Sequence, residues 1–90
     1  MNIELKGILK VIFAEEKIND ALSKKEIVVT IESDTPYPQD IACQAINKQM
    51  DLLTPFKMGD SVTVSCNLKG RESKPGKYYN QLAVWAIKKS

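Results

Sequence analysis

The stretch that decides the fold reads SVTVSCNLK, from Ser61 to Lys69. Apolar and polar residues alternate throughout it, so that one face is apolar and the other is polar. This period of two is typical of a β-strand, because successive side chains of a strand point to opposite faces of the sheet. Residues 61–69 are therefore predicted to line a barrel on one side and to face water on the other.

The beginning of the chain shows the same period over a longer distance. Apolar residues occupy odd positions from Ile3 to Phe13, and Gly7 takes a middle position of this series. A glycine in a strand permits a bulge or a sharp coil, because the missing side chain leaves the backbone room to bend. We therefore expect one long first strand that serves two parts of a sheet.

Shorter patterns indicate the next elements. Residues 26–32 alternate and read as a strand, and residues 39–46 read as a covered strand after the turn-forming residues 34–38. The apolar spacing then becomes helical over residues 47–54, with Asn47 as a plausible N-cap. One short helix is predicted there.

Two segments are less regular. In the last predicted strand, residues 78–88, Val84 indicates that even-numbered residues point inward, whereas Trp85 indicates that odd-numbered residues do. A bulge or burial on both faces would reconcile the two patterns. Residues 15–25 combine helical spacing with turn-forming residues, and we expect a mobile loop with a possible helical turn.

The order of elements is three strands, a short helix and two strands. It predicts a mainly β protein, a five-stranded Greek-key OB-fold barrel with its helix between strands three and four. Ninety residues suffice for one domain, so residues 1–90 are expected to form a single OB-fold domain. Hydrophobic residues at 43% and charged residues at 27% are ordinary values for a globular protein.

Charge is distributed unevenly. Residues 61–90 carry six Lys or Arg and one acid, a net +5, whereas residues 1–60 carry seven Lys and ten acids, a net −3, so the total is +2. Within the basic part, the turn-forming pair Pro75-Gly76 is flanked by cations and followed by Tyr78 and Tyr79. Such a hairpin would present positive charge and aromatic faces together, which suits phosphates and bases.

Cellular context follows from the cysteines and from hydropathy. Cys43 and Cys66 stand at alternating apolar positions without the paired spacing of a metal site, and we interpret them as reduced core thiols of a cytoplasmic protein rather than as a disulfide. No segment approaches the ~20 apolar residues that span a bilayer, so no membrane partner is expected.

The sequence offers little for catalysis. It has no histidine, no metal-ligand cluster, no phosphate-cradling glycine-rich loop and no nucleophile elbow. Glu15, Glu16 and Asp20 lie in a polar segment where solvation explains them. We expect a protein that is not an enzyme, without catalytic residues, metal or cofactor.

Several strings of this chain carry a family resemblance. The central string is FKMGDSVTV, residues 56–64. The strings around it are Asp51-Leu52-Leu53, Tyr37-Pro38, Gly70-Arg71-Glu72, Gly76-Lys77-Tyr78-Tyr79 and Trp85. Over nearly its whole length the chain resembles an uncharacterised bacterial domain-of-unknown-function family of small OB-fold proteins, similar to single-stranded-DNA-binding proteins. The resemblance implies an OB fold and single-stranded DNA, more than RNA, as the partner.

The chain departs from this family pattern in two places. The strand before the helix commonly ends in an aromatic residue, and residues 45–47 contain none, which removes one expected base-stacking platform. Single-stranded-DNA-binding proteins usually append a flexible acidic tail, whereas this sequence stops at Lys88-Lys89-Ser90. The resemblance therefore does not imply recruitment of partners through a tail.

Candidate nucleic-acid-binding residues cluster around the predicted hairpin. Lys69, Arg71, Lys74 and Lys77 are expected to contact phosphates, and Tyr79, with Tyr78 as the weaker candidate, is expected to stack on bases. Tyr79 should share the outward face of Gln81, whereas Tyr78 shares the parity of the apolar positions 82 and 84. Trp85 is interpreted as a packing residue, and Tyr37 and Phe56 as structural plugs.

An alternative is a protein-interaction or homo-oligomeric assembly module without nucleic-acid binding. OB barrels pair edge strands, and small ones often form oligomers. Val28, Ile8 and Ile12 lie on the otherwise polar faces of their predicted strands and would supply an apolar patch, unless the helix or a loop covers them. Both functions could coexist, because oligomerisation strengthens weak contacts with a strand.

Overall fold

Seven elements follow one another in residues 2–31 and 35–89, the part of the chain that this computed structural model describes. They are β1 (Asn2–Ile12), β2 (Glu16–Asn19), β3 (Leu22–Ile31), β4 (Gln39–Ile46), the 3-10 helix η1 (Asn47–Leu53), β5 (Ser61–Lys74) and β6 (Lys77–Lys89). The predicted strand end at Glu32 and the first turn residue, Asp34, lie outside the described residues. All five predicted strands are present, and β2 is additional.

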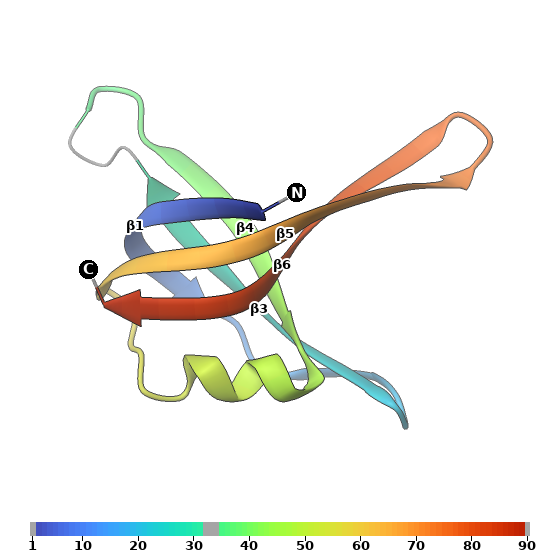
Figure 1. Ribbon diagram of the computed structural model, residues 1–90, viewed down its shortest axis with the longest axis horizontal. Coiled ribbons are helices and arrows are strands. Elements are labelled where there is room, and N and C mark those ends of the chain that lie inside the picture. The colour runs from blue at the N-terminus through green and yellow to red at the C-terminus, as the bar shows by residue number, and fades with distance from the viewer. Residues whose placement is uncertain (1, 32–34, 90) are drawn as a thin grey trace.

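The sheet closes into a barrel because β1 has two partners. Its residues Asn2–Ile8 pair with β5, and its residues Gly7–Ile12 pair with β3. From β1 the order of neighbouring strands is β5, β6, β4 and β3, and β3 pairs with β1 again, so these five strands form a closed ring. The helix η1 lies at one end of the ring, and the β5–β6 hairpin projects away from the ring on another side (Figure 1). This is the predicted Greek-key OB barrel, and the fold prediction is confirmed.

Gly7 sits where β1 passes from one partner to the other, opposite both Val62 and Ile31. A Cβ atom at this position would lie 2.1 Å from the backbone oxygen of Thr30, so no other residue fits without backbone movement. A register shift follows between Leu9 and Val11. The prediction that Gly7 lets one strand serve two parts of the sheet is confirmed, and close backbone approach is the reason.

The core lies inside this ring and is built from the predicted inward faces. Its buried members are Leu5, Leu9, Ile27, Val29, Cys43, Ala45, Leu53, Val62, Val64, Cys66 and Val84. The two cysteines are free thiols with their Sγ atoms 3.8 Å apart, as expected of reduced core residues. The hydrogen bond with Cys66, together with burial, raises the pKa of the Cys43 thiol.

The loop predicted for residues 15–25 is wrong, because this segment forms a second hairpin. β2 pairs with the first residues of β3, which begins at Leu22 rather than at the predicted residue 26. The Asn19 side chain accepts a hydrogen bond from the Ala21 backbone N–H at 2.9 Å and so stabilises the turn. The turn-forming residues therefore connect two strands instead of marking a loop.

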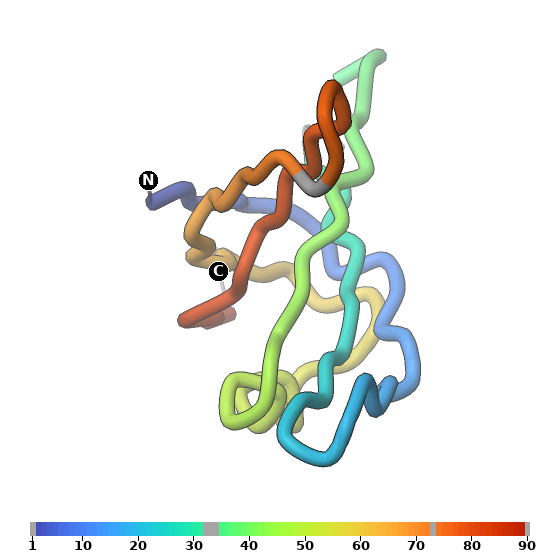
Figure 2. Tube along the Cα trace, turned by 90° about the vertical axis from the view of Figure 1, so that its right-hand side faces the viewer, coloured from blue at the N-terminus to red at the C-terminus, as the bar shows by residue number. Residues whose placement is uncertain are grey.

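The capping role predicted for Asn47 is also wrong. The helix is of the 3-10 type, its cap residue Ile46 makes no side-chain capping bond, and Asn47 has a positive φ of 51°. The Asn47 Oδ1 atom instead accepts a hydrogen bond from the Ser23 backbone N–H at 3.0 Å. Asparagine tolerates this backbone conformation, and here it ties η1 to the β2–β3 hairpin beside it (Figure 2).

The conflict of parity in the last strand is resolved by a bulge, as predicted. Ser65 pairs with Ala86 and Cys66 pairs with Val84, which leaves Trp85 as the extra residue of β6. Val84 before the bulge and Ile87 after it can therefore both contact the core. Trp85 itself is turned outward and is 47% exposed, so its interpretation as a packing residue is wrong.

The two expected plugs behave differently. Phe56 is half-buried and packs against the core, as predicted. Tyr37 is 76% exposed, so the same interpretation is wrong there.

We predict that Gly7→Ala destabilises the protein by about 2 kcal/mol, because the added methyl group would displace the Thr30 backbone. Urea unfolding would measure the loss. Gly70→Ala is the matched control on a strand, since its Cβ would meet the end of the Asn80 side chain at 3.0 Å and the Tyr79 backbone oxygen at 3.6 Å, an ordinary contact distance. Equal losses in the two variants would contradict the assigned role of Gly7.

Candidate nucleic-acid interface

The β5–β6 hairpin extends well beyond the barrel (Figure 1). Lys74 pairs with Lys77 across the predicted Pro75-Gly76 turn, where Gly76 has a φ of 80° that favours glycine. The Gly76 backbone N–H donates to the Glu72 carboxylate at 3.2 Å, which helps to order the tip. Cations are thereby held away from the barrel on both arms of one ribbon.

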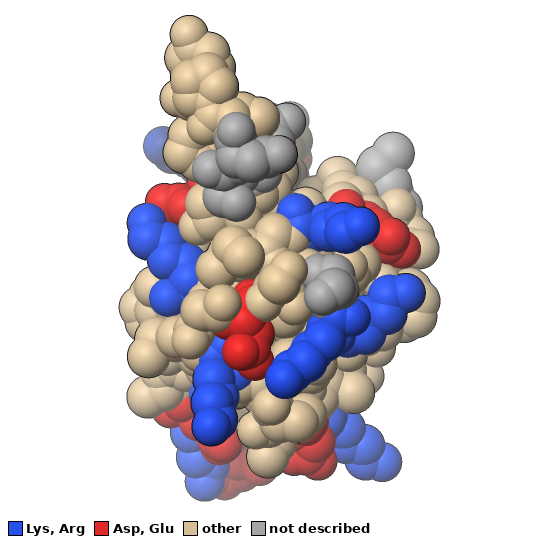
Figure 3. All heavy atoms as spheres, turned by 90° about the vertical axis from the view of Figure 1, so that its left-hand side faces the viewer, with Lys and Arg blue, Asp and Glu red and all other residues tan. Residues whose placement is uncertain are grey.

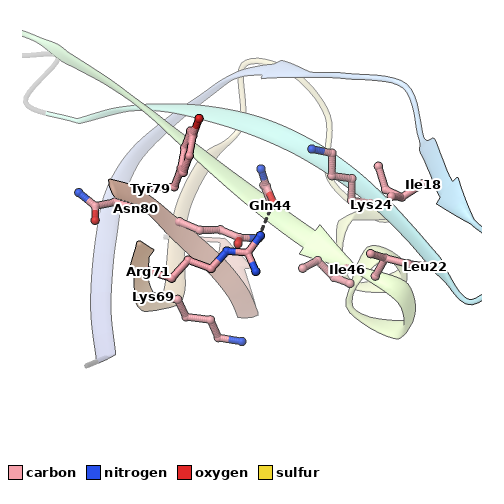
Figure 4. A pocket seen from close by; sticks show the side chains of 11 residues that line it. Ile18, Leu22, Lys24, Gln44, Ile46, Lys69, Arg71, Tyr79 and Asn80 are labelled. Carbon is pink, nitrogen blue, oxygen red and sulfur yellow. Dashed lines mark hydrogen bonds between the residues drawn. The ribbon is translucent and has the colours of Figure 1, made fainter. Parts of the chain in front are cut away.

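A cleft of about 610 Å³ separates this hairpin from the β2–β3 hairpin. Its lining comes from five strands, β2 to β6: Ile18, Leu22, Lys24, Gln44, Ile46, Lys69, Gly70, Arg71, Tyr79, Asn80 and Gln81. In Figure 4, Lys69, Arg71, Tyr79 and Asn80 lie on one side, and Ile18, Leu22, Lys24 and Ile46 on the other. The cleft therefore has a cationic, aromatic wall and a mainly aliphatic wall.

This division suits a nucleotide chain. Lys69 and Arg71 can neutralise phosphates, and the exposed face of Tyr79 can stack on a base. The aliphatic wall offers an apolar surface to a second base. Among the described lining residues three are cationic and none is acidic.

A smaller cavity makes the contrast clear. It measures about 410 Å³ and is lined by Phe13, Ala14, Glu16, Lys24 and Glu26, so that two carboxylates face one ammonium. The face seen in Figure 3, on the side of the molecule away from the hairpin tip, likewise carries acidic and basic side chains interspersed. The first cleft is the better match for a polyanion.

The floor of the cleft lies where β4 meets β6, a junction that we call the seam of the barrel. β4 and β6 run parallel, and Gln44 with Ala83 is their paired position within the described chain. One hydrogen bond between side chains reinforces this seam, from Gln81 Nε2 to Gln44 Oε1 (Figure 4). The polar floor therefore also joins the two halves of the sheet.

The predicted site residues fall into two groups. Lys69, Arg71 and Tyr79 line the cleft, whereas Lys74, Lys77 and Tyr78 lie farther out, at the hairpin tip. Tyr79 is 61% exposed, in agreement with its predicted outward direction. The inward parity expected of Tyr78 is wrong, because it is 72% exposed. The tip lies beyond the barrel, so both faces of the ribbon meet water there.

The opposite wall was missed from the sequence. Ile18, Leu22 and Lys24 belong to the segment interpreted as a mobile loop. An available signal was the pair Asn19-Asp20 between short apolar-containing runs, which is a hairpin pattern. Gln44 and Ile46 were missed because their strand was predicted as covered, whereas its outer face forms the cleft floor.

The described parts of the chain hold no candidate metal cluster and no helix that could span a membrane. Residues 2–31 and 35–89 contain no group of three or more Cys, Asp and Glu side chains placed to hold a metal ion. The helix within these ranges is too short to cross a membrane.

Solved structures with a similar fold include single-stranded-DNA-binding proteins. The mitochondrial single-stranded DNA binding protein Rim1 from S. cerevisiae superposes with a TM-score of 0.79 at 13% identity, covering 99% of this chain and 94% of that chain. A second crystal form of Rim1 gives a TM-score of 0.75 at 15% identity, covering 99% of this chain and 93% of that chain. The dimeric N-terminal domain of PriB from Thermoanaerobacter tencongensis gives a TM-score of 0.71 at 9% identity, covering 99% of this chain and 94% of that chain. At these identities the likeness establishes the OB fold.

Sequence comparison gives a family match. A family model described as a domain of unknown function (DUF3127) matches residues 4–88. The search of curated proteins found no match.

The hydrogen bond between the Gln44 and Gln81 amides on the cleft floor should contribute measurably to the free energy of unfolding. Gln44→Leu or Gln81→Leu alone should cost about 1 kcal/mol of unfolding free energy, because each leaves a part-buried amide without its partner. The double variant should lose less than the sum, with a coupling of about 1 kcal/mol in a urea double-mutant cycle. Gln39→Leu, an exposed glutamine on the same strand, is the control. Additive losses would show that the two amides do not act as a pair.

Proposed function

Since the chain belongs to the DUF3127 family, whose description assigns no activity, we propose from its surface that it is a non-catalytic protein that binds single-stranded nucleic acid with little sequence preference. DNA is the proposed ligand rather than RNA, and the cytoplasm the proposed location. Residues 1–90 are taken as one OB-fold binding domain. No cofactor or metal takes part in the proposed function.

One observation carries the proposal. The cleft of about 610 Å³ lies between two hairpins on the outer face of an OB barrel, and it combines three cations, an exposed tyrosine and an aliphatic wall. OB folds use this face and the two loops beside it to hold oligonucleotides. A cleft with this lining attracts the phosphate backbone and accepts bases without reading a particular sequence.

Binding would proceed through two kinds of contact. Lys69 and Arg71 would hold phosphates in the cleft and release counterions, and Lys74 and Lys77 would extend this contact toward the tip. Tyr79 would stack on a base for about 1 to 3 kcal/mol. Tyr78, exposed at the hairpin tip outside the cleft, would add a second ring there.

The choice of DNA rests on fold neighbours. Rim1 is a mitochondrial single-stranded DNA binding protein, and the fold of both its crystal forms matches this chain almost from end to end. RNA differs from DNA at this level by its 2′-hydroxyl group, which a protein can contact. A comparison of matched DNA and RNA oligonucleotides would decide between the two ligands.

The alternative function, homo-oligomeric or protein-binding assembly, has an observation of its own. Within the described chain, residues 2–6 of β1 pair with β5 alone, so the other edge of this segment has no strand beside it. Free strand edges are sites of association. The dimeric PriB domain among the fold neighbours supports the same idea. Val28, Ile8 and Ile12, the earlier candidates for an apolar patch, are half-buried.

Binding to a fluorescent single-stranded oligonucleotide at several salt concentrations tests the proposal. We expect binding at low salt that weakens as salt rises. The double change Lys69→Gln and Arg71→Gln should lower the slope of log K against log salt concentration by about 1.4, because two phosphate contacts are lost at roughly 0.7 each.

Lys57→Gln is the matched control, since this exposed lysine lies in the loop before β5, outside the cleft lining. Its salt dependence should equal that of the wild type. Absence of binding at low salt would refute the proposed function. Sedimentation of the same samples would test the alternative, which requires an oligomer or a protein partner.

A further inference from the structure

The face of the β5–β6 ribbon that lines the cleft does not end there. Directly opposite residues of an antiparallel pair share one face of the sheet. Arg71 lies opposite Tyr79 and Lys69 opposite Gln81, and all four line the cleft. The next positions on this face are Asn67 with Ala83, followed by Ser65 with Ala86 and the bulged Trp85. One continuous surface thus connects the cleft with the tryptophan.

Trp85 lies across this surface rather than upright on it. Its Nε1 donates a hydrogen bond of 3.0 Å to the Asn2 side chain on β1. β5 lies between β6 and β1, so the two side chains together must span the width of that strand, about 10 Å from outer strand to outer strand. The indole ring is therefore held over β5, and Trp85 is 47% exposed to solvent.

The residues around the ring are small. Ser65 on β5 is half-buried, and its partner Ala86 is next to Trp85 in sequence. Small side chains let the ring lie close to the sheet, and the hydrogen bond fixes its orientation. A flat, partly exposed aromatic ring with a fixed orientation is a platform for a nucleic-acid base.

Positive charge resumes beyond the ring. Thr63 on β5 lies between Lys6 of β1 and Lys88 of β6 in the register of the three strands. Both lysines are exposed, and Glu4, across from Ser65, is the acid on this part of β1. The surface therefore has cations at both ends, Lys69 and Arg71 in the cleft and the two lysines here.

We propose that a single strand of nucleic acid continues from the cleft along the outer face of the β5–β6 ribbon, stacks a base on Trp85 and ends against Lys6 and Lys88. The proposal rests on the proposed function and extends its site. Tyr79 and Trp85 are six residues apart on one strand, roughly 20 Å, so a short oligonucleotide fits the cleft while a longer one reaches the tryptophan.

Nucleic acid is favoured over a protein partner by the composition of the surface. Between its two cationic ends lie a single aromatic ring, three polar residues and two small apolar ones: Ser65, Asn67 and Gln81, with Ala83 and Ala86. A protein interface of this kind would centre on a larger apolar patch. A phosphate backbone with one stacked base uses the cations, the polar residues and the ring.

Fluorescence tests the proposal directly, because Trp85 is the sole tryptophan of the chain. Oligodeoxynucleotides of about 5 and about 16 nucleotides, lengths that bracket the sites of OB folds, should both bind at low salt. The longer one should quench the tryptophan emission, and the shorter one should bind without quenching it. This measurement uses the unmodified protein and does not depend on the folding of a variant.

Substitution supplies the second arm. Trp85→Leu should weaken binding of the longer oligonucleotide about tenfold and leave the shorter one unchanged, and Trp85→Phe should restore part of the loss. Tyr37→Leu is the matched control, because Tyr37 is exposed but precedes β4 and lies off the ribbon. It should change neither affinity.

The outcomes separate the two proposals. If both oligonucleotides bind while Trp85 emission and the Trp85→Leu affinities stay at wild-type values, the path to Trp85 is overturned and the proposed function stands. If neither oligonucleotide binds, the proposed function fails and the path fails with it. Quenching by added protein instead of DNA would overturn the nucleic-acid assignment of this surface.

Discussion

The structure depends on one close approach, that of the Gly7 backbone to the carbonyl oxygen of Thr30. At this point β1 leaves β5 and joins β3, and the exchange of partners turns an open sheet into a ring. A closed ring needs no second layer to bury its inner face, which is how ninety residues can enclose a core of small and medium side chains. The core in turn holds the strands from which both hairpins project.

Barrel closure is uneven around the ring. β5 and β6 pair over nearly their whole length, whereas β4 and β6 meet at one described pair, Gln44 with Ala83. Parallel strands that diverge leave their outer faces at an angle, and the cleft forms in that angle, with the Gln44 and Gln81 amides on its floor. The weakest seam of the barrel and its most concave surface therefore have the same cause.

The sequence was sufficient for the architecture because period-two alternation reports which side of a strand is buried. It predicted β5 from Ser61, the double role of Gly7 and the bulge near Trp85. It failed where the deciding contact is remote in sequence. Nothing local shows that Asn47 binds the Ser23 backbone. The β2–β3 hairpin is local, but its turn-forming pair Asn19-Asp20 was interpreted as part of a mobile loop, and so half of the cleft was missed. The predicted direction of Tyr78 was wrong because alternation cannot tell a strand inside a barrel from its extension into solvent, and that of Trp85 was wrong because the bulge in β6 turns this residue outward.

That extension has a consequence for how the protein can change over generations. All described side chains from Asn67 to Asn80 are exposed, so the outer hairpin adds nothing to the barrel core. Substitutions there are released from the packing constraint that governs the ring, and surface changes of this kind usually alter stability by no more than about 0.5 kcal/mol. Charge, length and aromatic content of the hairpin can diverge freely among descendants while the barrel stays the same. The fold thus separates the part that selection for stability must conserve from the part that selection for a ligand can remodel.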